Sequence, residues 1–402
     1  MRHAVLLVFS LAIAVIVYLQ LTSTNDVQAA PRYEVSVWYP GWGNAGISDY
    51  DSLSTNASSV GRVMPYWYAL NADGSVSPYE WAEDSKLVSL ARDKGIRLMP
   101  LVSNEFDPAR ANKMLSSQAS RDAHAAELTK LTVSKGYDGL DLDYESMYAA
   151  DRDNFSLFVE DLASRLHAED KKLSVVVHPK TSEPGNWDGP KAQDWRRISQ
   201  AADEFEIMIY DYHWNGSEAG PAAPQEWIES VLTFAEKEVD PAKIRMGLPF
   251  YGRDWMGTKA KDLVYDDVQA LLSQHNTTVQ RDPSGEPYFT YRDAGNSDHT
   301  VYFQDSKSLA AKLDVLALKH PNVGGISVWH IGGESPEHWT TVKNKLGQPA
   351  PAPPSSAPAP ASPPSAALPN SPSASPALVD KGKEDKKKKK KKKNGQGNKR
   401  GK

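Results

Sequence analysis

The sequence predicts an α/β fold in which eight parallel strands and their connecting helices form a (β/α)8 barrel. Short runs of β-branched and aromatic residues alternate with helical stretches from residue 31 to about residue 347, which is typical of a parallel sheet. Eight such runs occur, and their starts are 28, 35, 42, 34, 33, 39 and 80 residues apart. One βα unit of a closed barrel takes roughly 30 to 40 residues, so only the last spacing is too long. The expected architecture is therefore a TIM barrel with a small α+β insertion between strands 7 and 8.

The strand and helix boundaries follow from local residue patterns. The predicted strands are residues 34–38, 62–66, 97–101, 139–144, 173–177, 206–210, 245–249 and 325–329. Gly95 and Gly136 each follow a lysine and predict the ends of the helices before the third and fourth strands. Ser77, Pro78 and Glu80 have the spacing of a capping box and predict a helix that starts at Pro78.

The long last spacing contains two aromatic runs, residues 288–291 and 300–303, on either side of Gly295 and Asn296. Runs of this kind around turn residues predict a hairpin. We therefore expect a small inserted subdomain at about residues 256–305, within a barrel domain of residues 31–347.

Three segments outside the barrel differ from it in composition. Residues 1–30 contain a basic start, an apolar run and a small-residue cleavage site, which indicates a signal peptide or an uncleaved N-terminal anchor and hence a secreted or envelope-associated protein. Residues 348–379 form a linker rich in Pro, Ala and Ser. Residues 380–402 carry 13 Lys or Arg against 3 acids, whereas residues 1–379 carry 33 against 48. We expect a disordered tail that either aids solubility or binds an anionic wall polymer or membrane surface; no specific nucleic-acid partner is expected.

The chain contains no cysteine, which excludes disulfides, thiolate metal sites and a cysteine nucleophile. His178, His213 and His330 follow strand ends, where a metal-dependent hydrolase could place its ligands. Because no His-x-His or His-x-x-x-His pair accompanies them, we expect hydrogen-bonded polar histidines, and neither a metal nor an organic cofactor.

Asp141, Asp143 and Glu145 alternate with apolar residues on the fourth predicted strand, and we call these three side chains the carboxyl row. Side chains of a strand alternate between two faces, so the acids share the face that points into the barrel. Close burial of like charges forces at least one carboxyl to keep its proton, as a general acid must. A calcium loop of the EF-hand type is excluded by Ser146 and Arg152. A solvated acidic edge and another kind of metal site remain weaker alternatives.

The segment Asp138-x-x-Asp141-x-Asp143-x-Glu145 matches the fourth-strand signature of glycoside hydrolase family 18, the chitinase-like (β/α)8 barrels. The segments 208–211, 247–253 and 325–329 resemble the motifs of its sixth, seventh and eighth strands. The chain is most similar to the bacterial branch that contains spore-germination and peptidoglycan-fragment hydrolases. It differs from many chitinases in ending its third strand with Asn104 instead of Gly-Gly, which makes chitin itself a less certain substrate.

The resemblance implies a role for each acid. Glu145 would protonate the glycosidic oxygen, and Asp143 would orient the 2-acetamido group of the substrate, whose carbonyl attacks the anomeric carbon. Asp141 would share a proton with Asp143. Tyr210 and Asp211 are implied as hydrogen-bond partners of the acetamido group.

The implied binding residues are mainly aromatic. Trp329 would provide the apolar surface beneath the sugar, and Met208 and Asp138 belong to the same motifs. Four aromatic residues follow the first two strands, where mouth loops are expected and rings could stack on sugars: Tyr39, Trp42, Tyr66 and Trp67. Core packing is the alternative for each aromatic residue.

These observations together predict an exported, monomeric glycosidase that cleaves β-1,4 bonds next to N-acetylated amino sugars in peptidoglycan-type or chitin-like glycans. The alternative is a non-catalytic, lectin-like barrel that binds glycans and is tethered to the cell wall by its basic tail. A third hypothesis is a wall-anchoring protein whose functional segment is the lysine-rich tail.

Overall fold

The computed structural model describes residues 33–42 and 48–347. The predicted signal peptide or anchor, the predicted linker and the lysine-rich tail lie outside the described residues. Within the described ranges, no helix has both the length and the apolar composition needed to cross a membrane.

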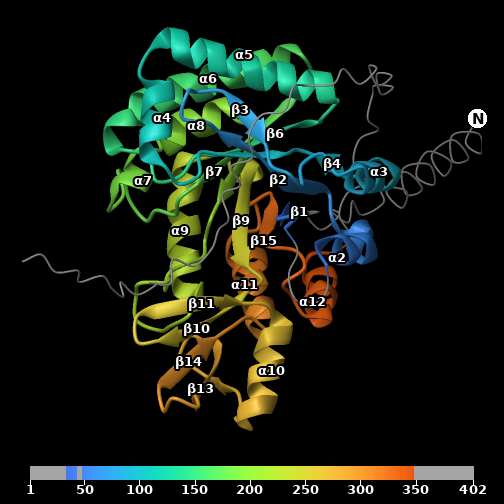
Figure 1. The fold of residues 1–402 in the computed structure, drawn as a ribbon, viewed down its shortest axis with the longest axis vertical. Coiled ribbons are helices and arrows are strands. Elements are labelled where there is room, and N and C mark those ends of the chain that lie inside the picture. The colour runs from blue at the N-terminus through green and yellow to red at the C-terminus, as the bar shows by residue number, and fades with distance from the viewer. Residues whose placement is uncertain (1–32, 43–47, 348–402) are drawn as a thin grey trace, which may run out of the picture. The chain divides into compact units, whose positions relative to one another are not determined.

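Eight parallel strands form a closed barrel, as predicted (Figure 1). In spatial order they are β1 (Glu34–Tyr39), β15 (Gly325–Trp329), β9 (Ile244–Pro249), β8 (Glu204–Ile207), β7 (Lys172–Val177), β6 (Gly139–Asp143), β5 (Leu101–Ser103) and β2 (Arg62–Leu70). Pairing of β2 with β1 closes the barrel. The third predicted strand is divided into β4 (Arg97–Leu98) and β5, because Pro100 between them has no N–H to donate to β2.

Helices connect the barrel strands along the chain. They are α2 (Asp49–Asn56), α3 (Ser85–Lys94), α4 (Pro108–Leu115), α5 (Gln118–Lys135), α6 (Arg152–Ala168), α7 (Asp188–Lys191), α8 (Trp195–Ala201), α9 (Gln225–Glu238), α11 (Ser306–Lys319) and α12 (Pro336–Leu346). Gly95 and Gly136 end α3 and α5 with φ of 67° and 70°, as predicted, because glycine adopts the left-handed conformation without steric cost.

The prediction of a helix that starts at Pro78 is wrong. Residues Val76–Pro78 form strand β3, which pairs with the end of β2 and extends that strand to Leu70. The Ser77 hydroxyl donates to Asn71 Oδ1 at 3.1 Å and does not cap a helix. Helix α3 starts only at Ser85, where the Asp84 side chain accepts from the N–H of Lys86.

The barrel packs two separate apolar layers. Leu140 and Leu142 of β6 and the following Tyr144 lie in the outer layer between strands and helices, where the Tyr144 ring stacks on Phe158 of α6. A smaller inner cluster includes Trp38 and is bordered by the carboxyl row. The predicted division of the fourth strand into an acidic inner face and an apolar outer face is confirmed.

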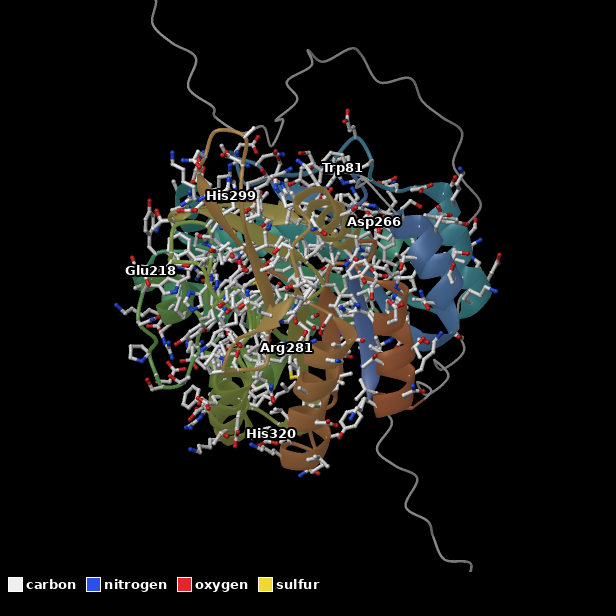
Figure 2. All side chains as sticks on the ribbon, turned by 90° about the horizontal axis from the view of Figure 1, so that it is seen from below. Trp81, Glu218, Asp266, Arg281, His299 and His320 are labelled. Carbon is white, nitrogen blue, oxygen red and sulfur yellow. The ribbon has the colours of Figure 1, made fainter. Side chains whose placement is uncertain are left out.

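The insertion between β9 and β15 is larger than predicted (Figure 1). It is a five-stranded antiparallel sheet in the order β11 (Lys259–Leu263), β10 (Gly252–Met256), β14 (Asp298–Tyr302), β13 (Pro287–Arg292) and β12 (Gln280–Arg281), with helix α10 (Tyr265–His275). The predicted hairpin is β13 and β14. The structure starts the insertion at Gly252, before the predicted residue 256. Figure 2 shows Arg281 and His299 on the ribbon of this insertion.

Candidate active site

The carboxyl row points into the barrel toward its C-terminal mouth. Asp141 is fully buried, Asp143 is 6% exposed, and Glu145 follows directly after β6 with its side chain 15% exposed. Asp141 accepts a hydrogen bond of 2.9 Å on Oδ2 from Nε1 of Trp38. Oδ1 of Asp143 is buried and has no hydrogen-bond partner among the described residues.

Burial without a neutralising cation makes all three carboxyls weak acids. Burial, together with the charge of Asp211, raises the pKa of Glu145 to about 8. Burial and the two neighbouring acids raise the pKa of Asp143 well above its usual range. Burial and then Glu206 raise the pKa of Asp141 to about 7. None of the three forms an ion pair with Lys or Arg within residues 33–42 and 48–347. Glu145 is therefore protonated at neutral pH and can donate a proton.

The row opens into a cleft of about 990 Å³. The sequence-predicted residues that line it are Asp143, Glu145, Tyr66, Met208, Tyr210, Asp211 and Trp329. The sequence analysis did not place several aromatic residues that also line it: Trp38, Phe106, Trp187, Tyr212, Trp214 and Trp227. The Trp38 ring lies edge-on to both Tyr210 and Trp329, with centroids 6.4 and 6.2 Å away. The cleft is therefore mainly aromatic around a few polar groups, as small-ligand and sugar sites are.

Asp211 is held by two residues near the start of the insertion. Its carboxylate accepts from the Tyr251 hydroxyl and from Nη1 and Nη2 of Arg253, at 2.6 and 3.1 Å for the guanidinium. Arg253 on β10 also donates from Nε to Asp262 of β11 at 2.6 Å. Asp211 itself has a φ of 61°, a strained conformation for a residue with a side chain. The insertion thus fixes one wall of the cleft.

Asn104 is a candidate functional residue that the sequence analysis recorded only as a departure from Gly-Gly. It is fully buried at the end of β5. Its Oδ1 accepts from the N–H of Glu145 at 2.9 Å, and its Nδ2 donates to the carbonyl of Glu145 at 2.6 Å. One amide therefore holds both backbone polar groups of Glu145.

His178 is the second residue that the sequence analysis misjudged. We expected a hydrogen-bonded polar histidine, but Nε2 of His178 is buried without a hydrogen-bond partner among the described residues. It lies 3.7 Å from Oε2 of Glu145 and its ring contacts Trp187 edge-on at 4.6 Å. Burial, with Lys180 nearby, lowers its pKa to about 3, so the ring is neutral beside Glu145. His213 and His330 do make hydrogen bonds, through Nδ1 to backbone carbonyls.

Two predicted binding residues lie away from the cleft, and we correct their assignment. Tyr39 points into the outer apolar layer, because its neighbour Trp38 takes the inward position on β1. Asp138 precedes β6, at the end opposite the mouth, and accepts from the N–H of Leu98 at 2.8 Å. Trp67 is likewise buried in the outer layer. Trp42 is 41% exposed and lies edge-on to Tyr66, with ring centroids 5.5 Å apart.

Within residues 33–42 and 48–347, no group of three or more histidine or acidic side chains is arranged to hold a metal ion. Trp81 lies next to Trp42 and stacks on Tyr79, with the ring centroids of Trp81 and Tyr79 4.7 Å apart (Figure 2). Its Nε1 donates to the carbonyl of Tyr66 at 2.8 Å. These contacts fix the β2 side of the mouth.

Comparisons with known proteins agree with this geometry. The family model described as Glycosyl hydrolases family 18 matches residues 34–334. The "Uncharacterized glycosylase YvbX" of Bacillus subtilis is 24% identical over 353 residues, covering 85% of this chain and 99% of that protein. The "Cortical fragment-lytic enzyme" of Bacillus subtilis is 26% identical over 275 residues, and the match covers 65% of this chain and 63% of that enzyme.

Among solved structures, a chitinase from Chromobacterium violaceum has a TM-score of 0.73 and 29% identity, and the match covers 79% of this chain and 99% of that one. The family match spans more than half of the chain and includes every strand of the barrel. The chain therefore belongs to the glycosyl hydrolases family 18 and is a glycoside hydrolase.

Proposed function

We propose that the protein hydrolyses β-1,4 bonds next to N-acetylated amino sugars, with Glu145 as the general acid and base and with the acetamido group of the substrate as the nucleophile. The observation that carries the proposal is the carboxyl row. Glu145 holds its proton at the cleft surface, and Asp143 lies beneath it as a second carboxyl whose pKa is raised by burial and by the neighbouring acids. A protonated carboxyl at the cleft can donate to a leaving-group oxygen at neutral pH.

In the first step, Glu145 gives its proton to the glycosidic oxygen as the bond from that oxygen to the anomeric carbon breaks. The acetamido carbonyl oxygen forms the new bond to the anomeric carbon, and an oxazolinium ion results. In the second step, Glu145 takes a proton from water, and the hydroxide oxygen opens the ring from the β face. Two inversions leave the β configuration.

The other roles follow from position in the cleft. Asp143 would accept from the acetamido N–H, the Tyr210 hydroxyl would donate to the acetamido carbonyl oxygen, and Asp211 would be a further hydrogen-bond partner of the substrate at this position. Trp329 would lie beneath the ring. Tyr66 and Met208 line the same cleft and would contact neighbouring sugars.

A nucleophile supplied by the protein fits this cleft less well. A retaining pair needs two carboxyls about 5 Å apart on opposite sides of the anomeric carbon. Asp143 ends β6 two residues before Glu145 and approaches from the same side. Asp211 is already engaged by Tyr251 and the guanidinium of Arg253.

The substrate class rests on the relatives. One similar protein is named for lysis of cortical fragments and another for chitin cleavage, and both names refer to glycans that contain N-acetylated sugars. We propose peptidoglycan-type or chitin-like glycans as the substrate. Export through the N-terminal segment and wall binding through the tail are further proposals that rest on the sequence alone.

Mass spectrometry of products tests the proposal directly. Purified peptidoglycan and N-acetylated chitin oligomers are incubated with the wild type, Glu145→Gln and the control Glu218→Gln, whose side chain lies on an exposed loop (Figure 2). We expect new reducing ends with the wild type and the control, and a loss of at least about 10²-fold with Glu145→Gln. Glycan retention without cleavage by the wild type would instead support the lectin-like alternative.

A further inference from the structure

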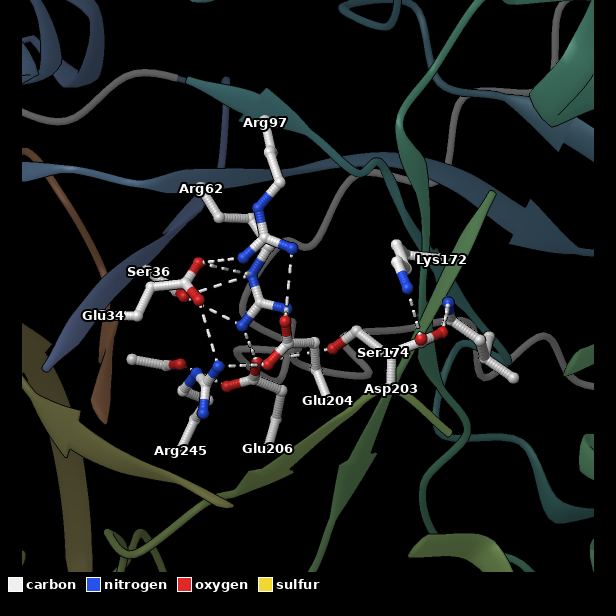
Figure 3. A network of polar contacts seen from close by, with 12 residues as sticks. Glu34, Ser36, Arg62, Arg97, Lys172, Ser174, Asp203, Glu204, Glu206 and Arg245 are labelled. Carbon is white, nitrogen blue, oxygen red and sulfur yellow. Dashed lines mark hydrogen bonds and ion pairs between the residues drawn. The ribbon is translucent and has the colours of Figure 1, made fainter. Parts of the chain in front are cut away.

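A buried charge network fills the end of the barrel opposite the mouth (Figure 3). It contains three guanidinium groups and three carboxyl groups, contributed by Arg62, Arg97, Arg245, Glu34, Glu204 and Glu206. Three positive charges face three negative charges, so the network is balanced when all six groups are ionised. No cation is then left over for the carboxyl row above it.

Glu206 is the member of this network that lies deepest in the barrel. Its side chain is fully buried and pairs with Nη2 of Arg62, which is also fully buried. The Ser327 hydroxyl donates to its second carboxylate oxygen. Arg62 is fixed in turn by Ser36, whose hydroxyl oxygen accepts from Nε at 3.1 Å and Nη2 at 2.9 Å. Contacts from β2 and β15 therefore hold the Glu206 carboxylate in one place.

Ser174 of β7 connects Glu206 to the carboxyl row. Its hydroxyl donates to Oε1 of Glu206 at 3.4 Å, and Ser174 is the register partner of Asp141 on the adjacent strand β6. Asp141 thus lies close to polar or charged groups from five strands, its own included. These are Trp38 of β1, Arg62 of β2, Asp143 on its own strand, Ser174 of β7 and Glu206 of β8.

The charges of these neighbours oppose one another at Asp141. Burial and then the Glu206 charge raise the pKa of Asp141, to about 7, while Arg62 lowers it. Because Arg62 already pairs with Glu206, its field at Asp141 is largely cancelled. Two carboxyls that both lie next to one buried serine favour a state in which one of them is protonated.

We propose that Glu206 is a positioning residue for the carboxyl row: its carboxylate, held by Arg62 and Ser327, keeps a proton on Asp141. Protonated Asp141 can donate a hydrogen bond to Asp143. The pH at which Asp141 loses its proton is then the pH at which the carboxyl row first becomes negatively charged. The catalytic consequence of this inference rests on the proposed function. The inference on the proton of Asp141 does not, because it can be measured without substrate.

Glu206→Gln preserves the shape of the side chain and removes its charge. The network is then left with an excess positive charge close to Asp141, so Asp141 should lose its proton at a lower pH. A unit charge at such a distance inside a protein shifts an ionisation by roughly 1 to 3 pH units. Glu204→Gln is the matched control, since it removes the same charge from the same network: Glu204 lies two residues earlier on β8 and pairs with Arg97, with Arg245 and, at 3.6 Å, with Nη1 of Arg62, but is not among the principal groups that shift Asp141.

The indole of Trp38 reports the charge of Asp141, because its Nε1–H donates to Asp141 Oδ2. Two-dimensional ¹H–¹⁵N NMR of the full chain, with the Trp38 resonance identified by its loss in Trp38→Phe, gives the midpoint of this titration. We expect the midpoint to fall by at least about one pH unit in Glu206→Gln and to stay within about 0.3 unit in Glu204→Gln. Equal shifts in both variants, or none in either, would overturn the inference.

Glu206→Asp keeps the charge balance of the network and tests the same inference if Glu206→Gln does not fold. Its carboxylate is withdrawn by one methylene from Asp141, so we expect a midpoint between those of the wild type and Glu206→Gln. A midpoint at the wild-type value would count against the inference. The catalytic consequence is measured separately. The midpoint of the acid limb in the pH dependence of kcat should move to lower pH by the same amount as the Trp38 midpoint. A shifted Trp38 midpoint with an unmoved acid limb would contradict the proposed use of Asp141 in the reaction, and would leave the assignment of its proton standing.

Discussion

Replacing Asn104 with alanine should misplace Glu145 without changing any residue that touches the substrate. Asn104 Oδ1 and Nδ2 bond the N–H and the carbonyl of Glu145 at 2.9 and 2.6 Å. Alanine leaves both backbone groups without these partners, and water cannot easily replace them because Asn104 is fully buried. The residue that carries the acid would then be held only by its chain neighbours.

The size of the effect can be worked from these two bonds. A buried polar group left without its partner costs about 1 to 3 kcal/mol, so loss of both partners should cost about 2 to 6 kcal/mol of unfolding free energy unless the loop moves. Movement of the loop relieves that cost but displaces Glu145, and a displacement of about 1 Å costs roughly 10²-fold in rate. We therefore expect a large fall in kcat together with a modest loss of stability.

The assay is kcat on a soluble N-acetylated oligosaccharide, with urea unfolding measured in parallel. Asn112→Ala is the control, since the Asn112 amide donates to Asp151 at 2.7 Å and belongs to helix α4. Asn104→Asp keeps the acceptor for the N–H of Glu145 and should be less impaired than Asn104→Ala. A kcat for Asn104→Ala within twofold of the wild type, with stability lost, would refute the view that this amide positions the acid.

Four further outcomes are expected. Glu145 keeps its proton in the folded state, whereas it loses this proton near pH 4.5 in the unfolded state. The unfolding free energy of the wild type should therefore fall as the pH rises from about 4.5 toward 8. In urea unfolding, Glu145→Gln should gain up to about 1.4 kcal/mol per pH unit relative to the wild type over this range. His178 stays neutral when folded, so wild-type stability falls below pH 6.5 and His178→Gln should gain relative stability as the pH drops toward 4. Arg253→Lys cannot make the bidentate contact with Asp211, and kcat/KM should fall about tenfold. Truncation after Val379 should abolish salt-sensitive retention on anionic wall material and leave the rate on a small substrate unchanged.

The barrel could be predicted because its pattern is repeated. Each βα unit contributes a short apolar run together with a helical segment, and errors in one unit do not affect the others. The predictions of secondary structure failed where one local residue pattern is compatible with two kinds of element. Ser77 and Pro78 have the residues of a helix start, but pairing with β2 makes them an edge strand, which tolerates proline. The short strands β10 and β11 at the start of the insertion contain too few apolar residues to be recognised.

Part of the site was available from alternation alone. Trp38 and Tyr39 are adjacent on one strand, so only one of them can face the cleft, and the inward position of Ser36 identifies Trp38. Asp138 lies seven residues before Glu145, which places it roughly 20 Å away along the strand direction.

The contacts of Asn104 and His178 could not be predicted. Both reach Glu145 from neighbouring strands or the loops that follow them. Their partners depend on the stagger of parallel strands, which a single sequence does not reveal. The same holds for Glu206, which was assigned only to a strand although its side chain lies beneath the carboxyl row.

The central claim is that the acetamido group of the substrate, and no carboxylate of the protein, attacks the anomeric carbon. Proton NMR of the first product released from an N-acetylated oligosaccharide tests this most directly, before the anomers equilibrate, with a partly de-N-acetylated oligosaccharide as the comparison. We expect the β anomer first, and no cleavage where the sugar on the non-reducing side of the bond lacks its acetyl group. Initial release of the α anomer, or efficient cleavage next to the de-N-acetylated sugar, would contradict the claim.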